Sequence, residues 1–265
     1  MYDFTYHRPS NLETAVRLTA AIEDAKVLAG GMSLLPTLKQ RLARHSDLVD
    51  LAGLDSLAGI RRDGDRLVIA AMTRHADVAA STELRRVIPA LADLAGEIGD
   101  PQVRNRGTIG GSLANSDPAA DYPAAAIALG ATLHTDRRAI AADDYFKDLF
   151  ETALEPGELI RAVDFPVPRR AAYRKFPNPA SRYAVVGVFV ADFGGGARVG
   201  VTGAGPCAFR WAAAEAALGG RLEPAALDGL AIDQSRFNSD HHASADYRAA
   251  LVRVMARRAV EAMLT

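Results

Sequence analysis

The sequence predicts an α+β protein of at least two domains, and three observations lead to this prediction. Strand-like and helix-like segments are mixed along the 265 residues, and apolar residues make up 49 % of them, enough for a substantial core. A chain of this length fits one large or two ordinary domains, at roughly 100–200 residues each. A stretch rich in prolines and basic residues, from 166 to 179, marks the expected domain boundary.

In the first hundred residues, short apolar runs alternate with helical patterns. Ser10 and Glu13 have the spacing of a capping box at the start of a helix. Gly30-Gly31 ends a short buried strand, and Pro36 fits the first turn of the next helix, where a missing N–H costs little. Asp63-Gly64 is typical of a turn before a strand. The elements expected here are a helix within 9–25, a strand over 26–29, a helix over 34–42, strands over 48–51 and 67–71, and a helix over 87–98.

Residues 99–122 differ from the rest of the first half. Glycines and small polar residues are frequent in this stretch, and long apolar side chains are few. A loop of such length is usually functional or disordered. Because residues 123–133 beyond it are apolar and predicted to be buried, we expect 99–122 to be a functional loop.

The second half is predicted to begin with a strand over 159–165 that Pro166 ends. The basic residues between 169 and 175 are interpreted as a solvated linker, or as a surface that faces an anionic partner. Gly194-Gly195-Gly196 lies between two β-type runs and predicts a hairpin over 183–202. After a helix over 211–218, apolar residues at helical spacing predict an amphipathic C-terminal helix: Tyr247, Ala250, Leu251, Val254 and Met255.

Composition excludes several classes of function. Lys and Arg number 31 against 32 Asp and Glu, so the basic excess expected of a nucleic-acid-binding protein is missing. Cys207 is the only cysteine, and one thiol cannot hold an iron–sulfur cluster or a zinc site. The sequence opens without a signal-peptide pattern and contains no run of about 18 apolar residues, so we expect a cytoplasmic protein without a membrane span.

The first segment with candidate chemistry is the predicted strand–turn–helix at Ala29, Gly30, Gly31, Met32 and Ser33. Glycine adopts backbone angles closed to other residues, and it lets a phosphate approach closely. Successive N–H groups in such a turn form an anion-binding nest, and the start of the next helix adds to its positive field. The competing interpretation is an ordinary strand-to-helix turn, because short glycine motifs are unspecific.

A second paired glycine is framed by hydroxyl residues, in the segment Thr108, Ile109, Gly110, Gly111 and Ser112. Asn115 and Asp121 follow in the same polar stretch, and Asp121 is a natural acceptor for ligand hydroxyl groups. A pyrophosphate needs donors on both sides, which two such turns can supply. A helix cap followed by a turn remains the alternative.

Other motifs are weaker. The glycines at 194–196 lie between predicted strands, whereas a dinucleotide fingerprint must lead into a helix. His241-His242 could ligate a metal, but a flexible surface segment is the favoured interpretation. No catalytic acid, base or nucleophile and no metal-ligand set is assigned. These patterns by themselves predict an α+β protein with two candidate phosphate loops and do not name a cofactor.

The order and separation of the loops resemble the FAD-binding medium subunit of the molybdenum hydroxylases, the family of xanthine dehydrogenase and aerobic carbon monoxide dehydrogenase. The resemblance runs over nearly the whole chain. The most specific stretch is 98–111, from Ile98-Gly99-Asp100-Pro101 to Gly110-Gly111. The other family-like segments are 4–9, 28–36, 117–123, 154–160, Lys175 with 181–184, and 244–248.

The resemblance implies an architecture. Residues 1–168 would form a vanillyl-alcohol-oxidase-type (PCMH-type) FAD-binding domain in two subdomains, about 1–55 and 56–168. Residues 172–265 would form a small C-terminal α+β domain with a three-stranded antiparallel sheet.

The resemblance also implies a non-covalent FAD site. The two glycine loops would hold the pyrophosphate, and Asp121 would bind along the ribityl or ribose chain. Ile98 and Ile160 would line the pocket, while Lys175 and Tyr183 would lie towards the isoalloxazine ring. The family often has a polar residue in place of Met32, and an Asn or Asp in place of Ser112, so some side-chain contacts to the cofactor differ here.

The implied role is electron transfer from partner iron–sulfur clusters through FAD to an external acceptor. A small [2Fe–2S] subunit and a large molybdopterin subunit would be the partners, in a dimer of heterotrimers, and the partner would choose the substrate. One alternative is a stand-alone FAD oxidase, although no histidine lies near the phosphate loop to tether the flavin. A flavin-free assembly subunit is the other alternative, and the intact paired glycines argue against it.

Overall fold

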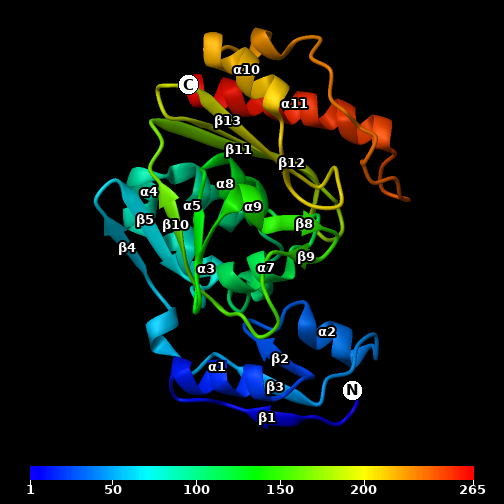
Figure 1. The fold of residues 1–265 in the computed structure, drawn as a ribbon. Helices are drawn as coiled ribbons and strands as arrows, with labels where there is room; N and C mark the ends of the chain where they lie inside the picture. Colours follow the sequence, from blue (N-terminus) through cyan, green and yellow to red (C-terminus); the bar gives the residue numbers. More distant parts are fainter.

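The computed structural model describes all 265 residues, and Figure 1 shows three layers along the molecule. A small N-terminal lobe with its own sheet lies at one end. A central layer holds a five-stranded sheet and most of the helices. A four-stranded sheet covered by the C-terminal helix lies at the other end, so the chain passes from layer to layer in sequence order.

The N-terminal lobe is a parallel three-stranded sheet in the order β1-β3-β2 with two helices. Helix α1 packs Ala15 against Val49 and Leu51 in a small core. Asn11, not Ser10, caps this helix, because its side chain accepts a hydrogen bond from the Thr14 N–H at 2.8 Å. The lobe contains β1 (Thr5–His7), α1 (Leu12–Ala21), β2 (Ala25–Leu28), α2 (Leu34–Lys39) and β3 (Asp47–Asp50).

The central layer is an antiparallel sheet in the order β4-β5-β10-β6-β7, packed against short helices around the largest core of the molecule. Every residue of α8 is buried there, which explains its apolar composition. The elements are η1 (Asp55–Leu57), β4 (Ile60–Asp63), β5 (Arg66–Ala70), α3 (His75–Ala80), α4 (Thr82–Val87), α5 (Pro89–Gly96), α6 (Pro101–Arg104), α7 (Ile109–Asn115), α8 (Tyr122–Ala128), β6 (Thr132–Thr135), β7 (Ala139–Ala141), α9 (Ala142–Tyr145), β8 (Phe146–Asp148), β9 (Glu151–Thr152) and β10 (Ile160–Pro166).

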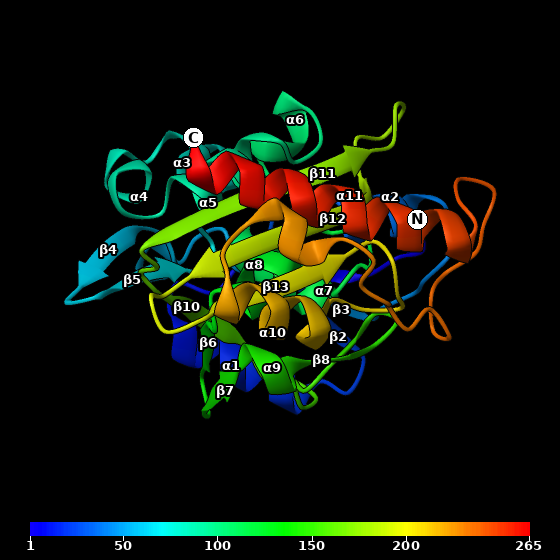
Figure 2. The same cartoon turned by 90° about the horizontal axis from the view of Figure 1, so that it is seen from above.

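The C-terminal layer is an antiparallel sheet in the order β11-β12-β13-β14, and its two faces pack on different neighbours. Phe189 and Ala191 of β12 join the central core, while Val188 and Val190 pack in the core that includes α11. Figure 2 shows α11 lying across the strands. The elements are β11 (Arg170–Pro177), β12 (Ala184–Asp192), β13 (Ala197–Thr202), β14 (Phe209–Arg210), α10 (Ala212–Gly220), η2 (Pro224–Leu227) and α11 (Ala245–Leu264).

Three expectations about loops and strands were wrong. The predicted loop 99–122 contains α6 and α7, because Asp100 and Thr108 cap these short helices by accepting from the N–H groups of Val103 and Gly111. The predicted linker at 169–175 is mostly strand β11. The predicted three-stranded sheet has a fourth strand, because the two-residue β14 pairs with β13.

The buried face of α11 also differs from the predicted one. Tyr247 and Val254 are exposed, while Arg248 is 4 % exposed. Arg248 is drawn inwards because its guanidinium group donates hydrogen bonds to two backbone carbonyls and to Asp240. Alanines make up much of the rest of the buried face. The prediction followed the large apolar residues, so the predicted face is shifted by about one residue from the observed one.

Candidate functional site

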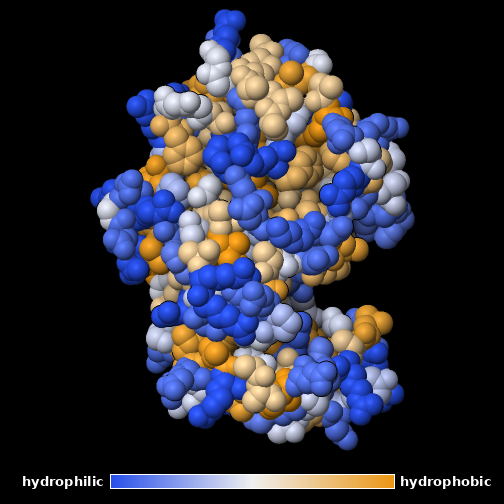
Figure 3. Space-filling view, in the orientation of Figure 1, coloured by the Kyte–Doolittle hydropathy of each residue, from blue (hydrophilic) through white to orange (hydrophobic).

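The two glycine loops lie against each other where the N-terminal lobe meets the central layer. A Cβ atom added to Gly30 would lie 2.2 Å from the carbonyl oxygen of Arg106, so only glycine permits this approach. A Cβ atom added to Gly111 would lie 3.3 Å from the Cβ of Ala29. The space-filling view shows a notch between the lobe that carries α2 and the layer above it, which carries α7 and the β8–β9 hairpin (Figures 1 and 3).

The first loop presents a row of free hydrogen-bond donors. The backbone N–H groups of Ala29, Gly30, Gly31, Met32 and Ser33 donate to no acceptor in the protein. Gly31 has a φ of +73°, the left-handed conformation that lets consecutive N–H groups converge on one anion. Gly30 and Gly31 are buried, where N–H groups are normally paired, whereas Met32 and Ser33 are exposed at the start of α2. The row is therefore available to an anion at this turn.

The second loop uses its backbone donors differently. The N–H groups of Ile109 and Gly110 donate to the carbonyls of Thr73 and Ala71, at 3.1 and 2.8 Å. The N–H of Gly111 donates to the Thr108 hydroxyl at 3.1 Å. Ser112 and Asn115 make no side-chain hydrogen bond within the protein, and the Thr108 hydroxyl accepts a bond but donates none. These three side chains and the Thr108 N–H are the donors that this loop can offer a ligand.

Gly110 has a packing role as well. A Cβ atom on it would lie 2.7 Å from the carbonyl oxygen of Ala71 and 2.5 Å from its Cβ. The close approach seats the start of α7 on the end of β5. The contact of Gly110 with Ala71 therefore sets the distance of the second loop from the central sheet. The contact of Gly30 with Arg106 sets the distance between the two loops.

Asp121 and Lys175 form a buried ion pair. Their side chains are 5 % and 4 % exposed, and the Lys175 Nζ lies 3.0 Å from Asp121 Oδ1. The same oxygen accepts a hydrogen bond from the Tyr173 hydroxyl at 2.5 Å, and Lys175 also donates to the Glu97 carbonyl at 2.8 Å. Burial raises the pKa of Asp121, and the nearby Lys175 opposes that rise. Asp121 Oδ2 makes no hydrogen bond with the protein, so it is the oxygen that can accept from a ligand.

Tyr183 lies apart from the glycine loops, at the rim of a pocket that it shares with Asp117 and Arg248. Tyr183 is 45 % exposed. Partial burial raises its pKa, and the carboxylates of Asp117 and Asp121 add to the rise.

The two isoleucines expected to line the pocket contact the central core. Ile160, at the start of β10, is 6 % exposed, and Ile98 is half-buried after α5. The Ile98 carbonyl accepts a hydrogen bond from Arg104 at 3.0 Å. Both side chains therefore lie among residues that support the site, and their predicted contact with flavin stays a prediction.

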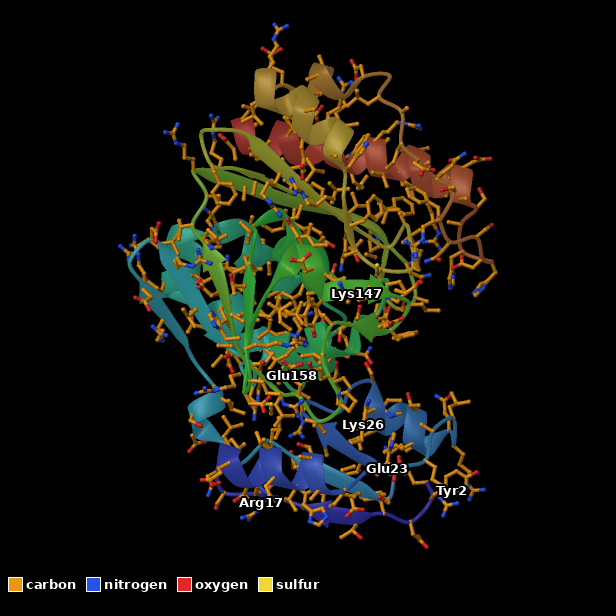
Figure 4. All side chains as sticks on the ribbon, viewed as in Figure 1. Tyr2, Arg17, Glu23, Lys26, Lys147 and Glu158 are labelled. Atoms are coloured by element: carbon orange, nitrogen blue, oxygen red, sulfur yellow. The ribbon has the colours of Figure 1, made fainter.

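The segment 154–160 joins the lobe to the central layer. The Thr19 hydroxyl of α1 donates to the Gly157 carbonyl at 3.4 Å. Hydrogen bonds from Arg138, with those from the Glu155 N–H and Thr135, lower the pKa of Glu158 to about 2, so this carboxylate stays charged. Figure 4 shows Glu158 at the junction, with Lys26 of β2 and Lys147 of β8 on opposite sides of the notch.

Sequence reasoning missed three residues of the site. Tyr173 was assigned to a linker, although its spacing of two from Lys175 indicates a shared strand face. Arg106 contributes only a carbonyl, which leaves no side-chain signal. His75 lies beneath the second loop, where a Cβ atom on Gly107 would be 2.5 Å from its Nε2. Burial lowers the His75 pKa to about 4, so the ring is neutral near pH 7.

The arrangement fits the pyrophosphate and sugar chain of a dinucleotide. The first loop offers consecutive N–H donors, the second offers side-chain donors beside it, and Asp121 offers one carboxylate oxygen. No group of three or more His, Cys, Asp or Glu side chains is placed to hold a metal ion. No helix has the length and apolarity needed to cross a membrane.

Comparison with known proteins agrees with this geometry. The family model described as FAD binding domain in molybdopterin dehydrogenase matches residues 2–168. The carbon monoxide dehydrogenase medium chain of Afipia carboxidovorans is 39 % identical over 276 residues, which cover 97 % of this chain and 96 % of that one. The 6-hydroxypseudooxynicotine dehydrogenase complex subunit alpha of Paenarthrobacter nicotinovorans is 36 % identical, with coverage of 96 % and 92 %.

A solved structure of the Cu,Mo-CO dehydrogenase in its cyanide-inactivated form contains a chain that superposes with a TM-score of 0.91 at 39 % identity, covering 98 % of this chain and 97 % of that chain. The fold and the family match thus define a flavin-binding subunit class. The chain belongs to the FAD-binding family of the molybdopterin dehydrogenases.

Proposed function

We propose that this chain is the FAD-carrying electron-transfer subunit of a multisubunit molybdenum hydroxylase. The observation that carries the proposal is the row of free N–H groups from Ala29 to Ser33, facing a second loop that only Gly30 allows to come so close. Such a row matches a pyrophosphate. The family match supplies the identity of the dinucleotide as FAD.

The residues of this chain bind and orient the cofactor in the proposal. The first loop holds the pyrophosphate through backbone donors, and Thr108, Ser112 and Asn115 add contacts from the other side. Asp121 accepts from a hydroxyl group of the sugar chain through its free oxygen. Lys175 and Tyr183 lie towards the isoalloxazine ring. Bound FAD supplies the redox chemistry, and the protein supplies binding, orientation and charge.

In this proposal the electrons come from partner subunits, which carry the [2Fe–2S] clusters and the molybdopterin. One cysteine cannot ligate such a cluster. The relatives are named as a medium chain and as a complex subunit. A dimer of heterotrimers in the cytoplasm, and domains over 1–168 (subdomains about 1–55 and 56–168) and 172–265, complete the proposal.

We expect FAD to bind reversibly. The chain has no histidine in either glycine loop to form a covalent link, so the hydrogen bonds described above must hold the cofactor. Acid precipitation of the purified flavoprotein should release the yellow colour into the supernatant. Flavin that remained with the pellet would contradict reversible binding, and a chain that took up no FAD on reconstitution would favour the assembly-subunit interpretation.

We also expect the isolated chain to oxidise no hydroxylase substrate. Purified alone and then with its genomic neighbours, it would be assayed for dye reduction with carbon monoxide, aldehydes, purines and N-heterocycles. Activity should appear only in the complex, because the chain has no group that can activate these substrates. Slow reduction of the flavin by NADH is compatible with the proposal. Turnover by the chain alone would instead support a stand-alone oxidase.

A further inference from the structure

We infer that the C-terminal sheet positions Asp121 for the flavin, through Thr202 and Gly203, so that residues beyond the matched range 2–168 are positioning residues of the FAD site. This inference rests on the proposed function, in which Asp121 binds the sugar chain of FAD.

The turn that delivers Asp121 is held by its carbonyl groups. Pro118 accepts a hydrogen bond from the Gly203 N–H at 2.7 Å, and Ala119 accepts from the Ala184 N–H at 3.3 Å. The Thr202 hydroxyl lies 2.7 Å from the Ala120 carbonyl oxygen and 3.0 Å from that of Pro118. Three consecutive carbonyls before Asp121 are therefore bonded to β12 or to the end of β13.

Thr202 and Gly203, which hold this turn, are themselves fixed by the surrounding structure. Thr202 is fully buried. Gly203 has a φ of +83°, and a Cβ atom on it would lie 2.6 Å from the Val185 carbonyl oxygen. Arg248 of α11 donates to the carbonyls of Val185 and Gly203 at 2.7 and 2.8 Å, which ties the terminal helix to the same corner. The Asp121 carboxylate then meets Tyr173 and Lys175, which also belong to this sheet.

Asp121 has one carboxylate oxygen free for a ligand, so whether that oxygen can reach the FAD sugar chain depends on the position of the 118–120 turn. A buried carboxylate cannot adjust by moving into solvent, and a shift of the 118–120 backbone would carry it out of reach. Asp117, next to the turn, accepts from the Ala119 N–H through its carboxylate at 2.8 Å, and the Thr202 hydroxyl is the side-chain group of the C-terminal sheet that bonds the turn. Because valine has nearly the same shape as threonine, Thr202→Val removes the hydroxyl and leaves the packing of the side chain in place.

The test is Thr202→Val in the full-length chain, with FAD binding measured by fluorescence titration of the apoprotein and by the visible circular dichroism of bound flavin. Loss of this buried hydrogen bond should weaken FAD binding about tenfold and change the flavin dichroism, while the melting temperature of the apoprotein falls by only a few degrees. Thr202→Ser keeps the hydroxyl and should restore both signals. Ser81→Ala removes the hydroxyl that caps α4, away from both glycine loops, and should leave FAD affinity unchanged.

Wild-type affinity and dichroism in Thr202→Val would overturn the inference, as would failure of Thr202→Ser to restore them. Should Thr202→Val not fold, Tyr173→Phe removes the other neutral bond to this unit, and an unchanged FAD affinity in that variant would also overturn it. The proposed function is tested separately by the wild-type chain and by Asp121→Asn. If the wild type takes up no FAD, the proposed function fails. If Asp121→Asn binds FAD as the wild type does, Asp121 is not a ligand and the inference fails while FAD binding stands.

Discussion

Gly30→Ala is expected to reduce FAD affinity by at least about 100-fold, a loss of about 2.8 kcal/mol. The added methyl group would meet the carbonyl carbon and oxygen of Arg106 and the Cα of Gly107, all of them backbone atoms that cannot rotate away. The two loops must then separate. The donors of the first loop would no longer face those of the second, and one pyrophosphate could not bridge them.

The measurement is flavin content after purification, followed by titration of the apoprotein with FAD. Gly195→Ala is the matched control, because a Cβ atom at that position meets nothing within 4 Å. Circular dichroism in the far ultraviolet should show both variants folded. Full flavin occupancy in Gly30→Ala would mean that the loop contact has no part in binding. Gly110→Val is a poorer test, since the contact with Ala71 links that glycine to the fold itself.

Lys175→Met is expected to destabilise the chain by about 3–5 kcal/mol near pH 8, because it leaves the Asp121 carboxylate buried without its counter-ion. For a chain of this size the melting temperature should fall by about 10 °C. The double variant Lys175→Met/Asp121→Asn removes both charges, so it should recover much of the loss. Lys147→Met changes an exposed lysine and should alter the melting temperature little.

The loss of stability in Lys175→Met should depend on pH in one direction. Burial raises the folded-state pKa of Asp121 above its unfolded value, and removal of Lys175 raises it further. A carboxyl group with a raised pKa contributes its stability below the unfolded pKa of about 4 and loses it as pH rises through the folded pKa. The gap in melting temperature between Lys175→Met and the wild type should therefore be smaller at pH 5 than at pH 8. An equal gap at both values would argue against a buried charged pair.

Features with a local cause were predictable from the sequence. The strand, the paired glycines and the helix around 26–39 were found because turn chemistry and short-range periodicity determine them. The hairpin turn at 194–196 and the buried segment after Pro123 were found for the same reason. The family resemblance also followed from short motifs in a fixed order, and the comparisons confirm it.

Strand β11 shows where such reasoning stops. Its basic residues and flanking prolines are typical of a linker. The alternation of a strand groups Tyr173 with Lys175 and apart from Arg174, but nothing local shows which of the two faces is buried. Their partner, Asp121, lies 52 and 54 residues earlier in the chain. A charged side chain is buried only where a distant group compensates it, so its burial is a property of the assembled fold.

The sequence by itself determined that the chain has two glycine turns able to approach an anion and that it resembles a flavin subunit. The tertiary structure decided which donors those turns keep. The N–H groups of Ile109 and Gly110 donate to the carbonyls of Thr73 and Ala71, which follow β5, whereas those from Ala29 to Ser33 have no acceptor in the protein. Each backbone N–H donates one good hydrogen bond. The packing of distant strands determines whether its acceptor is a carbonyl of the protein or an atom of a ligand.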